Sequence, residues 1–329
     1  MHMPELGLAQ PGPGLAQPGP GLALPVPVFQ RLVLIGIGLI GSSIARIARE
    51  RGDLAAEVVV SDSSPTVLER VAALGFADRI EADVARAVAG ADCVMLCAPV
   101  GAYAGIAAAV APHLTPGAIV TDVGSTKISV IRDVGPLLPA NVHFVPGHPL
   151  AGTEYSGPDA GFTTLFQGRW CLLTPPQGTD PAATERVAEL WRRAGSMVEV
   201  MDAAHHDRVL AIVSHLPHLI AFTICGTADD LATEAGLSQS GVGEASRSEV
   251  LKFAATGFRD FTRIAASDPV MWRDVFLNNR DALLEMLARF TEDAQAMARA
   301  VRWGDAAYIE DRIGRGRKIR QGLIELKQA

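Results

Sequence analysis

The sequence is poor in cysteine and has neither basic runs nor long uninterrupted apolar runs. Only four cysteines occur among its 329 residues: Cys93, Cys97, Cys171 and Cys225. They lack the spacing of a metal site, so we expect small core residues in a reducing compartment and no bound metal. A formal net charge of -7 without a basic run argues against a nucleic-acid-binding surface. No apolar run reaches the ~18 residues of a membrane span and no signal-peptide pattern is present, so we predict a cytoplasmic protein outside the membrane.

Proline and glycine dominate the N-terminal segment. Its near-repeat GLAQPGPGLAQPGPGLALP supports neither a hydrogen-bonded ladder nor a core face. We therefore predict a disordered, low-complexity segment over residues 1–29. An over-long reading frame explains the segment equally well, and a structural role is the alternative.

From Arg31 onwards, short apolar runs alternate with helical periodicity, which is typical of a parallel sheet with crossover helices. The expected strands are residues 32–35, 58–61, 93–98, 118–121, 142–145, 171–174 and 198–201. Gly52 is expected to end the first helix, and Ser64 and Gly75 to bound the second. The pattern predicts a Rossmann-type, doubly wound α/β dinucleotide-binding domain over residues 30–201.

Strand signals stop after about Met201, and helical patterns continue almost to the end of the chain. A Gly/Ser-rich break interrupts them around residues 236–243. We predict an all-α dimerisation and substrate domain over residues 202–329. Apolar periodicity from Val270 to Met297 is long for a helix exposed in a monomer, so we expect part of this surface to pack against a second subunit in a homodimer.

A glycine-rich turn follows the first expected strand and opens a helix. In a G-x-G-x-x-G turn the first glycine allows the bend, the second lets the backbone approach a pyrophosphate, and the third lets the helix pack on the strand. Gly36, Gly38 and Gly41 fit these roles, and the helix N-terminus favours phosphate. The predicted loop is Gly36-Ile37-Gly38-Leu39-Ile40-Gly41.

Polar and turn residues follow the later strands at the same sheet edge. Asp62 is placed to accept hydrogen bonds from the adenosine ribose and to repel a 2′-phosphate, which favours NAD over NADP. Its alternative role is to begin a turn before Ser64. Ala98 and Pro99 are further expected cofactor contacts. Ser125 is predicted to contact the nicotinamide or the substrate, or else to cap a helix.

Histidines mark two segments. His148, in GHPLAGTE, follows a strand, and a histidine there is suited to accept a hydroxyl proton as hydride leaves the same carbon; a structural histidine is the alternative. In SHLPH, His215 and His218 share a helix face without a convergent set of metal ligands. Upstream, Asp207 beside His205 and His206 is a candidate orienting partner for one histidine, or part of a solvated helix start.

A third segment places arginines beside phenylalanines. Arg259 and Arg263 suit a small carboxylate, because a guanidinium binds it through two charge-assisted hydrogen bonds. Intrachain ion pairs are the alternative for both. Ser267-Asp268-Pro269 is typical of a helix entry with proline in the first turn.

The motifs GIGLIGSS, TDVGSTK, GHPLAGTE, SHLPH and DFTRIAASDPVMWRD occur in the order found in prephenate and arogenate dehydrogenases of tyrosine biosynthesis. Over residues 31–300 the chain resembles this family. The resemblance implies a nucleotide domain, a helical dimerisation domain and an active site between them. It also implies NAD-dependent oxidative decarboxylation of prephenate, arogenate or both.

The resemblance also implies residue roles. His148 is similar to the family's catalytic histidine, which interacts with the substrate's ring hydroxyl, and Ser125 to a neighbouring polar contact. Arg263 resembles the arginine that holds the ring carboxylate. Arg259 stands where some relatives carry lysine. The expected substrate contacts are Arg263, His218, Thr153, Asp207, Trp272 and Arg259.

Two other functions share the same domain plan. A β-hydroxyacid dehydrogenase or related reductase relies on a helical lysine, but Lys252, Lys318 and Lys327 lack a suitable polar setting. A non-catalytic NAD-binding regulator is the second alternative. No additional regulatory domain is visible, so feedback inhibition by tyrosine would act at or near the active site.

Overall fold

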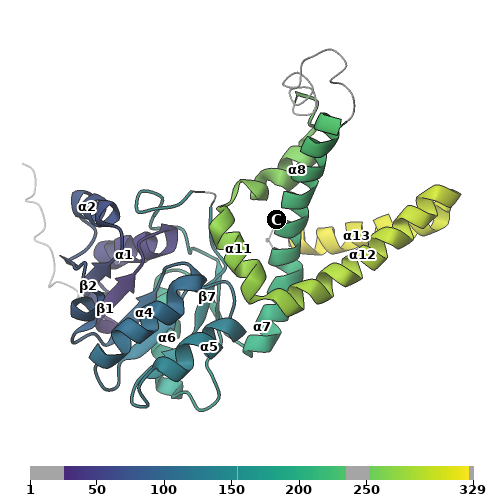
Figure 1. Cartoon of the computed structure of the whole chain (residues 1–329). Coiled ribbons are helices and arrows are strands. Elements are labelled where there is room, and N and C mark those ends of the chain that lie inside the picture. The colour runs from purple at the N-terminus through teal and green to yellow at the C-terminus, as the bar shows by residue number, and fades with distance from the viewer. Residues whose placement is uncertain (1–25, 154, 235–251, 326–329) are drawn as a thin grey trace, which may run out of the picture.

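The computed structural model describes residues 26–153, 155–234 and 252–325, which form an α/β part (residues 26–201) and a helical part (residues 202–325), as Figure 1 shows. The proline- and glycine-rich repeat and the Gly/Ser-rich break lie outside these residues. The first strand begins at Phe29, whose ring is fully buried, and the Val28 amide donates to the Asp53 carbonyl. Residues 26–29 are therefore part of the fold, and the segment predicted to be disordered extends too far.

The α/β part is built on a six-stranded parallel sheet with the strand order β3-β2-β1-β4-β5-β6, which is the order of Rossmann-type sheets. Its strands are β1 (Phe29–Ile35), β2 (Ala55–Ser61), β3 (Arg79–Ile80), β4 (Cys93–Leu96), β5 (Ile119–Asp122) and β6 (His143–Val145). The central strands are apolar because helices cover both faces of the sheet. The predicted fold class is confirmed.

Helices on the two faces close two separate cores. One core joins the sheet to α1, α2 and α6 through Ile44, Val71 and Trp191, and the other joins it to α3, α4 and α5. Gly52 and Gly75 end α1 and α2 in the left-handed conformation, as predicted. The helices are α1 (Leu39–Arg51), α2 (Pro65–Leu74), α3 (Val84–Val88), α4 (Tyr103–Val110), α5 (Ile128–Val134) and α6 (Pro181–Arg193), with short helices η1 (Val100–Ala102), η2 (Ala111–His113) and η3 (Gly135–Leu137).

A second, three-stranded sheet was not expected from the sequence. It consists of β7 (Gly147–Pro149), β8 (Trp170–Leu173) and β9 (Met197–Val200), with β7 antiparallel to β8. Residues 171–174 and 198–201 are thus close to real strands, but these do not extend the main sheet. Pro146 separates β6 from β7 and offers no backbone donor. Glycine and proline in β7 carry no strand signal.

The helical part begins with one continuous helix formed by α7, a π-helical turn and α8. The remaining helices include α12 and α13, which extend away from the α/β part as a pair (Figure 1). Its elements are α7 (Ala203–Leu210), η4 (Ala211–His215), α8 (Leu216–Glu234), α10 (Thr256–Thr262), η6 (Arg263–Ala266), α11 (Pro269–Asn278), α12 (Arg280–Trp303) and α13 (Ala306–Glu325). The helix expected from Val270 to Met297 is broken at Asn279, so that prediction was wrong.

The helix from Ala203 to Leu231 is long and apolar enough to cross a membrane by length and composition alone. It contains no long uninterrupted apolar run, because polar residues such as Ser214 and His218 interrupt an otherwise apolar segment. In the fold this helix packs against α10, η6 and α12, and it buries His206 and His215 completely.

The two parts dock closely. Helix α7 contacts α5, and α11 contacts η1. Gly101 in η1 faces the carboxylate of Asp274 in α11, and a Cβ atom on this glycine would lie 2.7 Å from Asp274 Oδ2. The loop after β4 therefore has a glycine where the helical part approaches it.

Candidate active site

The glycine loop has the geometry that a dinucleotide requires. Gly36 has a φ of 92°, and a Cβ atom there would lie 2.6 Å from the Ala98 nitrogen. A Cβ atom on Gly41 would lie 2.6 Å from the Gly36 oxygen, so the third glycine allows α1 to approach the strand. Gly38 faces open space, with no atom within 4 Å of the position that a Cβ atom would take, which leaves room for a pyrophosphate. Leu39 and Ile40 form the first turn of α1.

Asp62 accepts hydrogen bonds from both the glycine loop and the turn that follows β2. Its Oδ2 accepts a hydrogen bond from the Ile37 nitrogen at 2.8 Å, and its Oδ1 accepts one from the Ser64 nitrogen at 2.9 Å. Each carboxylate oxygen has a second lone pair for a ribose hydroxyl. The turn interpretation and the ribose interpretation are therefore compatible, and the residues present fit a dinucleotide.

The later cofactor candidates also lie at the carboxyl ends of the strands. Ala98 and Pro99 follow β4, and the Ala98 backbone lies directly against Gly36. Ser125 follows β5 and is half-buried. These positions place the predicted contacts along one edge of the sheet, where open α/β sheets bind ligands.

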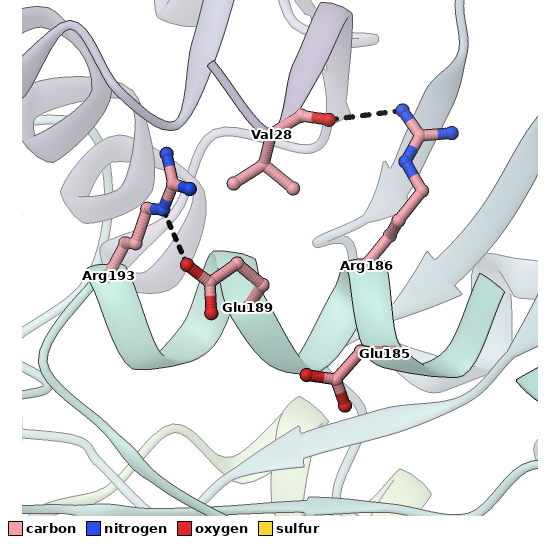
Figure 2. A pocket seen from close by; sticks show the side chains of 5 residues that line it. All are labelled: Val28, Glu185, Arg186, Glu189 and Arg193. Atoms are coloured by element: carbon pink, nitrogen blue, oxygen red, sulfur yellow. Dashed lines mark hydrogen bonds and ion pairs between the residues drawn. The ribbon is translucent and has the colours of Figure 1, made fainter. Parts of the chain in front are cut away.

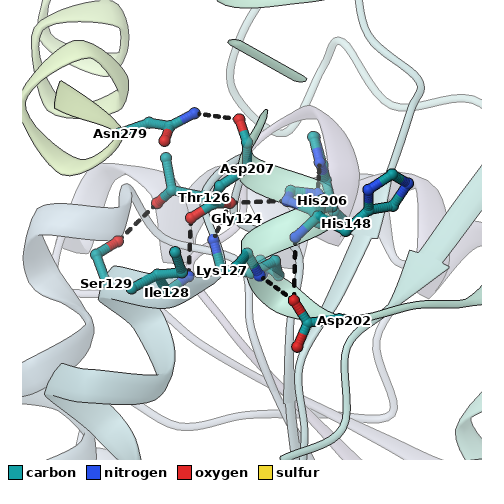
Figure 3. A network of polar contacts seen from close by, with 12 residues as sticks. Gly124, Thr126, Lys127, Ile128, Ser129, His148, Asp202, His206, Asp207 and Asn279 are labelled. Atoms are coloured by element: carbon teal, nitrogen blue, oxygen red, sulfur yellow. Dashed lines mark hydrogen bonds and ion pairs between the residues drawn. The ribbon is translucent and has the colours of Figure 1, made fainter. Parts of the chain in front are cut away.

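His148 belongs to a buried chain of side chains that crosses between the two parts (Figure 3). It lies on β7 with 8% of its surface exposed, and its Nδ1 is 2.9 Å from His206 Nε2. His206 Nδ1 is in turn 2.8 Å from Asp207 Oδ1. His205 is exposed, whereas His206, which the sequence did not single out from its neighbour, is fully buried.

Asp207, expected either to contact substrate or to orient a histidine, lies inside the protein. It is 1% exposed, and both carboxylate oxygens are engaged within the chain. Oδ1 accepts from the Lys127 nitrogen at 2.8 Å, and Oδ2 accepts from the Ile128 nitrogen at 2.9 Å. Asp207 therefore orients His206 and fixes the start of α5.

The electrostatic setting keeps His148 neutral. Burial lowers its pKa well below the ordinary value of 6.5, and the neighbouring His206, Lys127 and His215 lower it further. The pKa of His206 is also lowered, mainly by burial, although the hydrogen bond to Asp207 opposes this shift. At neutral pH the His148 ring has a lone pair available for a proton.

A buried ion pair lies beside this histidine. Lys127 and Asp122 are both fully buried, and Lys127 Nζ lies 2.5 Å from Asp122 Oδ2. Nζ also donates to the Gly147 carbonyl at 2.7 Å, while Asp122 accepts from the Gly124 and Gly147 amides. Burial lowers the pKa of Lys127, and the negative charge of Asp122 opposes that shift. The pair thus fixes β7, and with it His148, against the end of β5.

Lys127 was not predicted from the sequence. Its motif, TDVGSTK, contains both members of the ion pair, but a lysine in a loop is usually exposed. The closeness of Asp122 and Lys127 in sequence is a signal that could have indicated the pair.

The SHLPH segment and Trp272 form an aromatic cluster. The rings of His218 and Trp272 stack with centroids 3.7 Å apart, and Phe222 and Phe276 surround them. His218 Nδ1 lies 2.9 Å from the Ser214 carbonyl, to which it donates. Burial lowers the pKa of His218, the hydrogen bond to Ser214 opposes this shift, and the positive charge of Arg263 adds to it. Arg263 begins η6, which packs against α8, the helix that holds His218.

The ring of His215 lies edge-on to Trp272, with 6.1 Å between the centroids. It is fully buried, and burial lowers its pKa to about 4. The side-chain amide of Asn279 lies 3.0 Å from His215 Nδ1 and donates to the Asp207 carbonyl at 2.8 Å. The break between α11 and α12 thus places an amide against the histidine network.

Thr153 and Arg259 lie on exposed segments. Thr153 Oγ1 accepts from the Tyr155 nitrogen at 3.3 Å, and Thr153 lines a shallow hollow with Tyr155 and Phe162. Arg259 lies on α10 with its guanidinium 3.5 Å from the Thr256 hydroxyl. In the described residues neither has a hydrogen bond to the histidine chain.

A second hollow lies between α6 and the start of β1 (Figure 2). Arg186 donates to the Val28 carbonyl at 3.1 Å, and Arg193 donates to Glu189 at 2.7 Å. This hollow lies at the amino end of β1, opposite the edge that holds the glycine loop. Its charged groups pair with the chain itself, so it does not resemble the candidate site.

Comparisons with known proteins agree with this site. The family model described as prephenate dehydrogenase, nucleotide-binding domain, matches residues 44–200, and the model for the dimerization domain of the same family matches residues 202–313. The cyclohexadienyl dehydrogenase of Zymomonas mobilis is 41% identical over 90% of this chain and 97% of that protein. The prephenate dehydrogenase of Bacillus subtilis is 31% identical over 89% of this chain and 76% of that protein.

A solved structure gives the same result. Prephenate dehydrogenase from Aquifex aeolicus, in complex with hydroxyphenyl propionate and NAD+, matches with a TM-score of 0.77 and 32% identity, over 90% of this chain and 98% of that one. The matches of the two family models together span His148, His206 and Asp207. The chain belongs to the prephenate dehydrogenase family.

Proposed function

We propose that the protein catalyses the NAD-dependent oxidative decarboxylation of prephenate, arogenate or both, in tyrosine biosynthesis. The relatives named above act on such substrates by name, and the glycine loop fits a dinucleotide. The observation that carries the proposal is a neutral, buried histidine, His148, where the α/β and helical parts meet.

The substrate is a cyclohexadienol whose ring also bears a carboxylate. NAD+, when bound, takes up the hydride that leaves the hydroxyl-bearing carbon. His148 accepts the hydroxyl proton, so that the oxygen lone pair can form the carbonyl as the C–H bond breaks. The bond to the ring carboxylate then breaks, its electron pair enters the ring, and carbon dioxide leaves. Formation of an aromatic ring drives this loss, and the new phenol oxygen regains a proton.

The proposed substrate contacts come mainly from the helical part. Arg263 holds the ring carboxylate, and His218 and Trp272 form the pocket beside it. The two rings stack, and η6, which begins with Arg263, packs against α8. Ser125 contacts the hydroxyl from the α/β part. Arg263 must position the carboxylate without binding it more tightly in the ground state than in the transition state, since uniform binding does not speed the chemical step.

One assay tests this proposal. NADH formation is followed with prephenate and with arogenate, each with NAD+ and NADP+. We expect NADH from at least one substrate and a preference for NAD+, because the Asp62 carboxylate beside the glycine loop would repel a 2′-phosphate. Absence of turnover with both substrates would refute the proposal.

We also propose that the chain forms a homodimer through α12 and α13. Several large apolar side chains on these helices are exposed, and Trp303 is 81% exposed. The matched family model is described as a dimerization domain. Light scattering should give twice the mass of one chain, and a monomer at micromolar concentration would contradict this. The exposed apolar residues include Leu284, Phe290, Val301, Trp303, Ile313 and Ile319.

A cytoplasmic location and inhibition by tyrosine complete the proposal. Tyrosine is the product expected from arogenate, so it should compete at the same pocket. We expect tyrosine to raise the substrate KM without changing kcat. Cell fractionation tests the cytoplasmic location separately.

A further inference from the structure

We infer that His206 and Asp207 set the tautomer of His148 and act as positioning residues for it from the helical part of the chain. The inference rests on the proposed role of His148 as the base. It is carried by the hydrogen bonds that join the three side chains, and not by the family resemblance.

Asp207 acts as a hydrogen-bond acceptor toward its neighbours. Its two oxygens accept from the backbone nitrogens of Lys127 and Ile128, and backbone N–H groups can only donate. A carboxylate that faces two such donors is held as an acceptor. The proton in the 2.8 Å contact between His206 Nδ1 and Asp207 Oδ1 therefore belongs to His206.

The proton on His206 Nδ1 determines which nitrogen of His148 is protonated. A neutral His206 with its proton on Nδ1 has a lone pair on Nε2, which lies 2.9 Å from His148 Nδ1. Two nitrogen lone pairs facing each other at this distance would repel, so His148 Nδ1 must carry a proton and donate it to His206 Nε2. The lone pair of neutral His148 is then on Nε2. This is the nitrogen that remains free to accept a proton from a substrate.

The same hydrogen bonds persist when His148 becomes charged. When His148 gains a proton on Nε2, its Nδ1–H bond to His206 stays in place, and no ring has to turn. Other charged or titratable groups near the ring are Lys127, paired with Asp122, and His215 from η4. The carboxylate of Asp207 is joined to His148 through His206, so it stabilises the new positive charge through a hydrogen-bonded path.

The chain also crosses the junction between the two parts. His148 and the amides of Lys127 and Ile128 belong to the α/β part, whereas His206 and Asp207 belong to α7. Asn279, at the break between α11 and α12, donates to the Asp207 carbonyl and fixes that backbone. The base therefore receives its orientation only when α7 is docked against α5.

Nitrogen-15 NMR of the histidine rings tests the assignment in the wild-type protein without substrate. We expect His148 to carry its proton on Nδ1 and His206 to carry its own on Nδ1 as well. A His148 protonated on Nε2 would overturn the inference, whatever the activity of any variant.

Two variants extend the test to turnover. His206→Leu removes the acceptor for His148 Nδ1, so we expect a mixture of His148 tautomers and a kcat lower by on the order of 10²-fold, with KM changed little. His206→Gln offers an amide oxygen as acceptor and should restore part of both the tautomer and kcat. His205→Leu, at the exposed neighbouring position, should change neither.

The outcomes separate this inference from the proposed function. Suppose that His148→Asn abolishes turnover but His206→Leu leaves the His148 tautomer and kcat unchanged. The positioning role of His206 is then refuted, whereas the role of His148 as the base is not. If His148→Asn leaves turnover intact, the base itself is refuted, and the NMR assignment still reports on the hydrogen-bonded chain.

Discussion

The cofactor edge of the α/β part and the helical part are built from different kinds of groups. The α/β part builds its cofactor edge mostly from backbone, with Gly36, Gly38 and Gly41 leaving space and amides exposed. The helical part buries polar side chains such as His206 and Asp207 and leaves large apolar ones such as Trp303 exposed. The comparison suggests that cofactor binding depends on the shape of a local loop, whereas the proposed chemistry depends on side chains brought together from distant segments.

The largest expected effect is at the junction itself. His148→Asn should lower kcat by roughly 10²- to 10⁴-fold, the usual contribution of a positioned acid or base. Affinity for NAD+ should stay unchanged, because the glycine loop is separate from this side chain. Steady-state kinetics and a binding titration measure the two effects, and an unaltered kcat would remove His148 from the mechanism.

The next effect concerns the buried ion pair. Lys127→Met should destabilise the protein by about 3–5 kcal/mol, because Asp122 is left as a buried charge without its partner. Urea unfolding measures this change. Arg132→Met, which removes a member of an exposed pair, is the matched control and should have little effect. If the two variants had equal free energies of unfolding, the buried pair would contribute no more to stability than the exposed pair.

Arg263→Ala tests the substrate side of the comparison. We expect the substrate KM to rise by about 10- to 150-fold, which corresponds to the 1.5–3 kcal/mol of a hydrogen bond to a charged group. Arg259→Ala, on the exposed face of α10, should raise it less. An unchanged KM in the Arg263 variant would indicate a structural arginine.

Two glycine variants separate fold from cofactor binding within the loop. Gly36→Ala should cost stability by on the order of 1–3 kcal/mol, because its φ is positive and Ala98 is too close. Gly38→Ala should leave stability unchanged but raise the KM for NAD+, since its open space is where a pyrophosphate would lie. Thermal unfolding with and without NAD+ distinguishes the two variants. If both lost the same stability and the same stabilisation by NAD+, the separate roles of Gly36 and Gly38 would be contradicted.

The smallest effect is the response of stability to acid. The folded-state pKa values of His148, His206 and His215 lie below the ordinary value of 6.5. As the pH falls below 6.5, the unfolded chain therefore binds more protons than the folded chain. The stabilisation that these neutral histidines contribute should be present above about pH 6.5 and decrease towards pH 4. His215 alone should account for a loss of about 1 kcal/mol at pH 5.5. His215→Gln should flatten the urea-unfolding profile between these pH values; an unchanged profile would contradict this.

The sequence predicted the features that depend on neighbouring residues. Gly52 and Gly75 end helices, Asp268 caps α11, and Gly36 turns the loop, because each needs only a local conformation. Their signals are contained in a few consecutive positions. This is why the fold class and the cofactor loop could be predicted from the sequence alone.

The features that were missed depend on distant contacts. His148 meets His206 across 58 positions, and Lys127 donates to Asp207 across 80. No periodicity reports such a meeting, so the sequence named Asp207 as a candidate partner for a histidine without indicating which histidine it contacts. The three-stranded sheet and the break at Asn279 have the same cause, since their short elements are held by partners elsewhere in the chain.

A crystal structure with NAD+ and a para-hydroxyphenyl product analogue tests the central claim most directly. We predict that the hydroxyl of the analogue lies about 2.6–3.2 Å from His148 Nε2, the range for proton transfer, while His148 Nδ1 keeps its bond to His206. A hydroxyl held by other groups, or a His148 ring turned so that Nδ1 faces the ligand, would contradict the account.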